Sequence, residues 1–185
     1  NTGSIMDRLL RFCNAIVGRF PGGLAQVNVL QSVVFASMSG SALADAAGSG
    51  KLMQEMMTRG NKYTPEFAAA LSAVSSVIGP ILPPSIPLVL YALVSDASIG
   101  YLFLAGVVPG LLIGAVQMAL IYFQAKRRNF AVEEPVPVRE LPRITREAFP
   151  ALMLPVILLG CLYSVVTTPT EAAGVASAYA LLVSG

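Results

Sequence analysis

The sequence predicts an all-α integral membrane protein with a re-entrant helical hairpin and a helix broken by prolines. Its composition is 55% hydrophobic and only 12% charged, with a mean hydropathy of +0.71. Apolar runs end at basic clusters, as at residues 126–128, and two runs are interrupted by residues that end helices. These three features together are typical of a helical protein whose solvent is lipid.

The first segment, residues 1–23, is predicted to form an amphipathic helix at the membrane interface, followed by a turn. Ile5, Leu9 and Phe12 recur at the spacing of one helix face. The cluster at 18–23 combines glycines with a proline and ends the helix. Because the chain lacks an initial Met and a signal-peptide pattern, we expect its start to be internal to a longer protein.

Residues 24–57 are predicted to form the re-entrant hairpin. An arm of about 15 residues rises only about 22 Å, which is less than the roughly 30 Å hydrocarbon core. Ser-Gly-Ser at 39–41 separates the two arms, and Arg19 and Arg59 flank their outer ends. Basic residues at both ends place both on the cytoplasmic side, with the polar tip at mid-membrane. The alternative is two short complete spans joined by an outside turn.

Residues 66–94 are predicted to form a discontinuous helix. Thr64 and Pro65 have the residue types of a helix start. The sequence GPILPPS at 79–85 then breaks the apolar run, because a continuous helix cannot accommodate so many prolines. Only the two halves together are long enough to span the membrane.

The remaining chain is predicted to form one long span over 96–128, a cytoplasmic linker over 129–147, and the first helices of a second half over 148–185. Thr-Pro-Thr-Glu at 168–171 has the spacing of a capping box, which favours a capping role for Glu171 over a transport role. The last apolar run is too short to cross the bilayer, so we expect the sequence to stop inside a span.

Each break offers two kinds of binding surface. The half-helices that end there are expected to leave unpaired carbonyl oxygens near 35–38 and 75–78, which suit a small hard cation such as Na⁺. The half-helices that begin near Ser41 and Ser85 present N–H groups to an anion, and a carboxylate fits. Paired broken helices of this kind are the design of secondary transporters.

Asp45 lies one turn into the second hairpin arm, where an acid in an apolar segment is a functional candidate. A carboxylate near hydroxyls and carbonyls suits a hard cation, although it could instead stabilise the start of the half-helix. The hydroxyls of Ser37, Ser39 and Ser41 are candidate ligands, with close helix packing as the alternative.

Other classes of function have little support. The net charge of +2 is too scattered for a nucleic-acid surface. Cys13 and Cys161 have no paired spacing and no His is present, so both are interpreted as packing residues, and no cofactor or transition metal is expected. An intramembrane enzyme lacks a nucleophile with a base. A channel whose breaks line a selective pore remains the alternative to a carrier.

Five motifs resemble one family across nearly the whole chain, in the family's order: GRFPGGLA (18–25), MSGSA (38–42), IGPILPPS (78–85), SIG (98–100) and TPTEAA (168–173). The resemblance is to the large, DctM-like membrane subunit of tripartite ATP-independent periplasmic (TRAP) transporters. It implies Na⁺-coupled uptake of a small organic anion by an elevator mechanism in the bacterial inner membrane. It also implies a small membrane subunit and a periplasmic binding protein as partners.

The resemblance also implies roles for individual residues. The family's first sodium site lies between the hairpin and the broken helix, and the matching positions here are Ser39, Asp45, Gly79, Leu82 and Pro84. The substrate's carboxylate is expected at the same two breaks, near Ser37, Gly40, Ser41, Pro83 and Ser85. Membrane lipid and the organic acid are the remaining expected partners. The family's second half, with its second sodium site, has no counterpart in this sequence.

Overall fold

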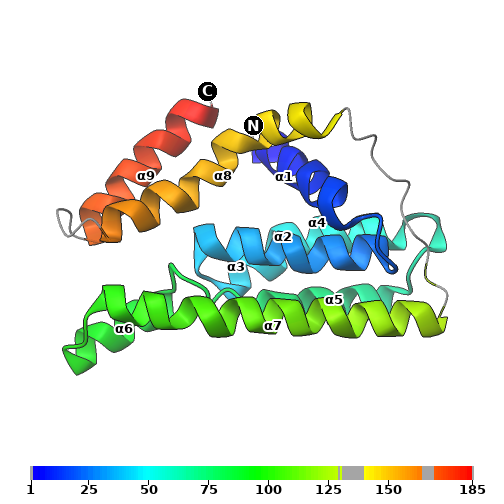
Figure 1. Cartoon of the computed structure of the whole chain (residues 1–185), viewed down its shortest axis with the longest axis horizontal. Helices are drawn as coiled ribbons and strands as arrows, with labels where there is room; N and C mark the ends of the chain where they lie inside the picture. The colour runs from blue at the N-terminus through cyan, green and yellow to red at the C-terminus, as the bar shows by residue number, and fades with distance from the viewer. Residues whose placement is uncertain (1, 129, 131–139, 164–168, 185) are drawn as a thin grey trace.

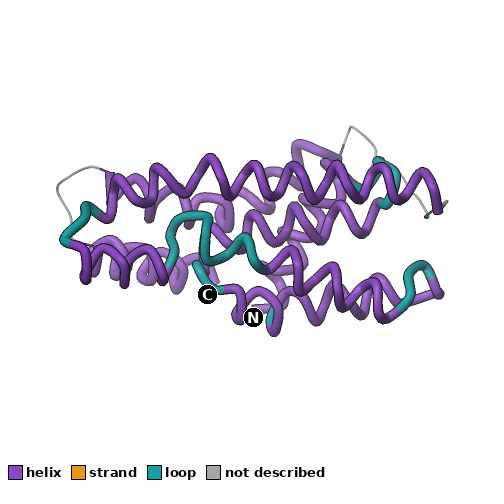
Figure 2. Tube along the Cα trace, turned by 90° about the horizontal axis from the view of Figure 1, so that it is seen from below, coloured by secondary structure: helices purple, strands orange, loops and turns teal. Residues whose placement is uncertain are grey.

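The computed structural model describes residues 2–128, 130, 140–163 and 169–184, and this part of the chain contains helices and no strand. The helical path is clear in both views (Figures 1 and 2). The all-α prediction is therefore confirmed for the described residues. The helices are α1 (Thr2–Val17), α2 (Gly23–Ser39), α3 (Ala42–Ala47), α4 (Ser49–Thr58), the short 3₁₀ helix η1 (Arg59–Asn61), α5 (Pro65–Ser76), α6 (Ile86–Ser95), α7 (Ile99–Arg128), α8 (Leu141–Tyr163) and α9 (Pro169–Ser184).

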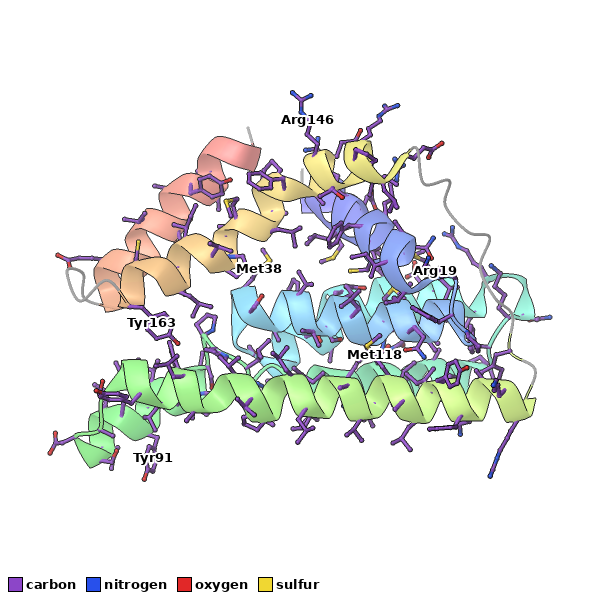
Figure 3. The ribbon with its side chains drawn as sticks, viewed as in Figure 1. Arg19, Met38, Tyr91, Met118, Arg146 and Tyr163 are labelled. Atoms are coloured by element: carbon purple, nitrogen blue, oxygen red, sulfur yellow. The ribbon has the colours of Figure 1, made fainter. Side chains whose placement is uncertain are left out.

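Helix α2 is the centre of the packed part, in contact with α1, α4, α5 and α7 (Figure 1). Leu24, Val27 and Val29 are almost fully buried, as expected for a helix with neighbours on several sides. The side-chain amide of Gln26 donates to the carbonyl oxygen of Met118 at 3.0 Å and joins α2 to α7. Figure 3 shows Met118 between these two helices. The C-terminal end of α2 therefore belongs to a helix that is packed on several sides.

Helix α1 is amphipathic, as its periodicity predicts. Leu9, Cys13 and Val17 are buried, while Asp7 and Arg8 are exposed. Its neighbours are α2 and α8. Burial raises the pKa of the Cys13 thiol to about 12, so the thiol stays protonated near neutral pH. This agrees with the prediction that Cys13 is a packing residue.

Two helices of the described part, α7 and α8, are long and apolar enough to cross a membrane. Many of their apolar side chains are largely exposed, such as Val108, Leu112 and Leu120 of α7 and Val156 of α8. Tyr91 of the shorter helix α6 also points outward (Figure 3). A continuous exposed apolar surface is unfavourable in water and favourable in lipid.

Two boundaries differ from the prediction. The second hairpin arm, predicted as one helix over 42–57, is divided at Gly48 into α3 and α4. Helix α8 begins at Leu141, inside the predicted linker, and an exposed ion pair between Arg143 and Glu147 at 3.0 Å supports its first turns. The rest of that linker, apart from Phe130 and Glu140, and the predicted capping residue at 168 lie outside the described residues.

Candidate functional site

The first break joins α2 to α3 through Gly40 and Ser41. Gly40 has left-handed backbone angles (φ 61°, ψ 16°), and its N–H donates to the carbonyl of Ala36 at 3.0 Å. Ser41 has an extended backbone, and its hydroxyl accepts from the N–H of Ala44 at 3.3 Å. Ser41 therefore caps α3, as predicted, and the chain reverses within a very short segment.

The second break joins α5 to α6 through residues 77–85. Gly79 N–H donates to the carbonyl of Ser76 at 3.0 Å, and Leu82 N–H donates to that of Ile78 at 2.9 Å. Ser85 caps α6 by accepting from the N–H of Leu88 at 3.3 Å, and its hydroxyl donates to the carbonyl of Pro80. The break is therefore an ordered series of turns that ends in a predicted cap.

The two breaks cross each other in direct contact. A Cβ atom at Gly40 would collide with the carbonyl oxygen of Pro84 and lie 3.2 Å from the Cα of Ser85. A Cβ atom at Gly79 would lie 3.0 Å from the carbonyl carbon of Ser41. Each glycine thus permits the close approach of the opposite break. Segments some forty positions apart in the sequence form a single site.

Four of the five predicted cation residues lie at the crossing. Gly79, Leu82 and Pro84 belong to the second break, and Ser39 directly precedes the first. Ser39, Pro84 and Ser85 line an open cavity of about 200 Å³, and apolar residues of α6 form the rest of its lining. Gly79 and Leu82 are buried in the turns of the second break. The backbone N–H of Ser41 lies 3.5 Å from the hydroxyl oxygen of Ser39, so that hydroxyl is held only weakly.

The fifth predicted cation residue, Asp45, lies on the first turn of α3 and is 1% exposed. The hydroxyl of Ser49 donates to its Oδ1. Its Oδ2 has no hydrogen-bond partner in the described part of the chain. One oxygen of this buried carboxylate is therefore fixed, and the other is left without a protein donor.

The predicted substrate residues fall into two groups. Gly40, Ser41, Pro83 and Ser85 belong to the crossing itself. Ser37 does not, because its hydroxyl donates to the carbonyl of Val34 in its own helix at 2.6 Å. With Met38, it lines a separate cavity of about 370 Å³ between the end of α2 and the helices α8 and α9. Figure 3 shows Met38 on this side of α2.

The expectation that carbonyl groups near the breaks are unpaired is wrong for several of them. The carbonyls of Ala36, Ser75, Ser76 and Ile78 each accept a backbone N–H from the following turn. The physical reason is that both breaks are tight turns rather than extended strands, so nearby N–H groups reach back to these oxygens. The Ile78 carbonyl accepts two N–H groups, from Ile81 at 3.1 Å and Leu82 at 2.9 Å, and so uses both of its lone pairs.

A buried polar cluster below the crossing was not predicted. The amide of Asn28 and the hydroxyl of Ser32, both on α2, each donate to the hydroxyl oxygen of Ser75 on α5 at 3.0 Å. Ser72 of α5 and Ser49 of α4 are also almost fully buried. The available signal was the repeat of polar residues one helical turn apart within apolar runs, as in Asn28 and Ser32 or in Asp45 and Ser49.

Comparison with known proteins identifies the family. The family model described as "Tripartite ATP-independent periplasmic transporter, DctM component" matches residues 1–185. The chain is 46% identical over 181 residues to the sialic acid TRAP transporter large permease protein SiaM of Vibrio cholerae, covering 98% of this chain and 42% of that protein.

Two further relatives have different named substrates. The C4-dicarboxylate TRAP transporter large permease protein DctM of Pseudomonas aeruginosa is 42% identical over 183 residues, which is 99% of this chain and 43% of that protein. The 2,3-diketo-L-gulonate TRAP transporter large permease protein YiaN of Escherichia coli is 40% identical over 184 residues, 100% of this chain and 43% of that protein. The chain spans less than half the length of these relatives.

These relatives are named as permeases, and permeases are not enzymes, so the family confirms the prediction that the protein is not an enzyme. The motifs that carried the resemblance include both halves of the crossing, MSGSA and IGPILPPS. The chain belongs to the DctM component family of tripartite ATP-independent periplasmic transporters, whose members are membrane permeases.

Proposed function

We propose that this chain is part of a large permease subunit that carries a small organic anion into the cell together with Na⁺. The observation that carries the proposal is the crossing of two broken helices, with Gly40 against Pro84 and Gly79 against Ser41. A break inside an apolar helix leaves some backbone groups without the partners that a continuous helix would give them. Where two such breaks are in contact, helix C-terminal ends with partial negative charge and helix N-terminal ends with partial positive charge lie close together.

The cation is proposed to bind where α2 and α5 end. The hydroxyl of Ser39, the carboxylate of Asp45 and the carbonyl groups of Gly79, Leu82 and Pro84 would supply its oxygen ligands. Oxygen ligands of this kind suit Na⁺, and the negative ends of two helix dipoles add to the attraction. The unpartnered Oδ2 of Asp45 supports this assignment, because a buried carboxylate oxygen without a donor is costly unless a cation approaches it.

The substrate's carboxylate is proposed to bind where α3 and α6 begin, near Ser41 and Ser85. Both serines cap their helices, and the other N–H groups of each first turn would face the anion. The relatives are named for sialic acid, C4-dicarboxylates and 2,3-diketo-L-gulonate. The shared chemical class is a small carboxylate, and that is the class we propose for this chain.

The remaining parts of the proposal follow from the family. A small membrane subunit and a periplasmic binding protein would complete the transporter, and the binding protein would deliver the substrate. Residues 24–95 would belong to the part that moves in an elevator-like transition, with the hairpin 24–57 entering and leaving from the cytoplasmic side. The protein would reside in the bacterial inner membrane as a multi-pass subunit surrounded by lipid.

The test is uptake of labelled substrate into proteoliposomes that contain the full-length permease, its small partner subunit and the binding protein. Wild type is compared with Asp45→Asn and Ser39→Ala, with and without an inward Na⁺ gradient. Uptake should require both Na⁺ and the binding protein. Asp45→Asn should reduce it by about tenfold or more, since it removes the only full charge of the site.

Asp96→Asn is the matched control. It makes the same chemical change at an exposed position in the turn between α6 and α7, and Asn tolerates the left-handed angles found there (φ 54°). Uptake by this variant should equal wild type. Uptake that is indifferent to Na⁺ and to the binding protein would contradict the carrier and favour a channel.

A further inference from the structure

The Asp45 carboxylate is held from outside its own helix. Asp45 belongs to α3, whereas Ser49, which donates to Oδ1, is the first residue of α4. Between them, Gly48 has backbone angles (φ −87°, ψ −88°) that end α3. The hydroxyl oxygen of Ser49 also lies 3.1 Å from the carbonyl oxygen of Asp45. One serine side chain thus spans the kink that divides the second hairpin arm.

The surroundings of Ser49 allow it little freedom. Ser49 is 1% exposed. A Cβ atom at the next residue, Gly50, would lie 3.2 Å from the Asp45 carbonyl oxygen and 3.5 Å from the Cβ of Ser72 on α5. Helices α4 and α5 therefore pack closely beside the serine. A buried hydroxyl in a close-packed environment has a fixed direction, so the carboxylate that it binds is fixed too.

A hydrogen-bonded bridge between α2 and α5 lies next to the carboxyl group. The Ser32 hydroxyl lies beside the Asp45 carboxyl group and donates to the Ser75 hydroxyl oxygen. That oxygen also accepts from Asn28, and the Ser75 hydroxyl donates to the carbonyl of Ser72 at 3.2 Å. Ser75 thus uses both lone pairs and its one proton, which is the full capacity of a hydroxyl.

The bridge continues into the second break, because the carbonyl of Ser75 accepts the N–H of Ile78 at 3.2 Å. The next residue is Gly79, which contacts the first break at Ser41. Asp45 therefore lies beside a polar cluster that is hydrogen-bonded to the turns of the second break. A group that must meet a small cation at a fixed distance needs such support from surrounding residues.

We propose that Ser49 is a positioning residue for the cation site: by binding Oδ1 of Asp45 it orients Oδ2 towards the ion. This inference rests on the proposed function and deepens it. Ser49 does not itself contact the ion. Its loss should leave the Asp45 carboxyl group present but free to rotate, so Na⁺ should bind more weakly while transport at saturating Na⁺ continues.

The experiment measures the Na⁺ dependence of uptake in the reconstituted full transporter for wild type, Ser49→Ala and Ser49→Thr. Ser49→Ala should raise the Na⁺ concentration for half-maximal uptake by about tenfold or more, the loss expected for one hydrogen bond to a charged group. The maximal rate and the KM for substrate at saturating Na⁺ should stay near wild type. Ser49→Thr, which keeps the hydroxyl, should restore the wild-type Na⁺ dependence.

Ser76→Ala is the matched control. Ser76 is as buried as the serines of the cluster, yet its hydroxyl donates only within α5, to the carbonyl of Ala73 at 2.8 Å. Its removal should leave the Na⁺ dependence unchanged. A Ser49→Ala variant that lowers only the maximal rate or the amount of folded transporter, as a purely structural role would, overturns the inference.

The outcomes also separate this inference from the proposed function. If wild-type uptake needs Na⁺ and Ser49→Ala has the wild-type half-saturation, only the positioning role fails. If wild-type uptake does not need Na⁺, both fail. If Ser49→Ala does not fold, Ser49→Thr decides: the wild-type Na⁺ half-saturation supports the role, and the same loss of folding in a variant that retains the hydroxyl contradicts it.

Discussion

The two breaks reach the same arrangement by different means. The first occupies only Gly40 and Ser41, and its reversal depends on one glycine with left-handed backbone angles. The second extends over 77–85 and contains three of the prolines that prevent a continuous helix. Both end in a serine that caps the next helix. A short break is therefore sensitive at a single residue, whereas a long one distributes its constraints over several.

The largest effect is expected for Gly40→Ala. The new Cβ would collide with the Pro84 carbonyl oxygen, and the positive φ of 61° adds backbone strain. The free energy of unfolding of the full-length subunit should fall by more than about 3 kcal/mol, or no folded subunit should be recovered. Thermal unfolding in detergent, with recovery from size-exclusion chromatography, measures this.

Gly60→Ala measures the cost of the backbone strain alone, without a contact between the breaks. Gly60 has a similar φ of 68°, yet nothing lies within 4 Å of a Cβ placed there. Its substitution should cost only about 1 kcal/mol. Equal losses for the two variants would mean that the contact between the breaks contributes nothing.

A smaller loss is expected for Gly79→Ala, about 2 kcal/mol. Its backbone angles are ordinary, so only the approach of Ser41 and Ala42, at 3.0 and 3.1 Å from the new Cβ, must relax. Gly160→Ala in α8 is the control, because nothing lies within 4 Å of that position and Ala favours a helix. Of the glycine variants, Gly160→Ala should have the highest unfolding midpoint. A Gly79→Ala variant as stable as this control would contradict the crossing.

The position of the breaks was predictable because glycine, proline and serine act locally. Gly40 ends a helix by its own backbone freedom, and Ser41 and Ser85 cap helices through their nearest N–H groups. The contact between Gly40 and Pro84 could not be deduced from the residue pattern alone, because the residues around each break do not indicate which distant segment will pack against it. The resemblance to the family supplied that relation.

The polar cluster below the crossing was missed for the same reason. Asn28 and Ser75 are distant in sequence, and each alone is an ordinary small polar residue in an apolar helix. The division of the second arm at Gly48 was also missed, because an isolated glycine in a helical pattern is usually tolerated. Both features depend on how α4 and α5 pack against α2.

The two capping serines give a direct comparison of the breaks. Ser41→Ala removes one capping bond and should cost about 1 kcal/mol. Ser85→Ala also leaves the Pro80 carbonyl without its donor, so it should cost about 2 kcal/mol. Chemical unfolding of the two variants in parallel measures the difference. A larger loss of stability for Ser41→Ala than for Ser85→Ala would contradict this expectation.

The smallest effect on stability is expected for Ser39→Ala. Its hydroxyl makes only a weak contact, 3.5 Å from the Ser41 nitrogen, so the free energy of unfolding should change by less than about 0.5 kcal/mol. Under the proposed function, the same variant should still lose Na⁺-dependent uptake severalfold. A large loss of stability without a change in Na⁺ dependence would make Ser39 a structural residue.

The most direct test of the central claim is a cryo-EM map of the full-length subunit with its partner subunit, recorded once in Na⁺ and once in a large organic cation. In Na⁺, the map should show density for an ion between the first and second breaks, within about 2.3–2.6 Å of the Ser39 hydroxyl, the Asp45 carboxylate and the proposed backbone carbonyls of Gly79, Leu82 and Pro84. That density should be absent with the organic cation. Breaks that lie apart, or ion density that is identical in both maps, would contradict a sodium site at this crossing.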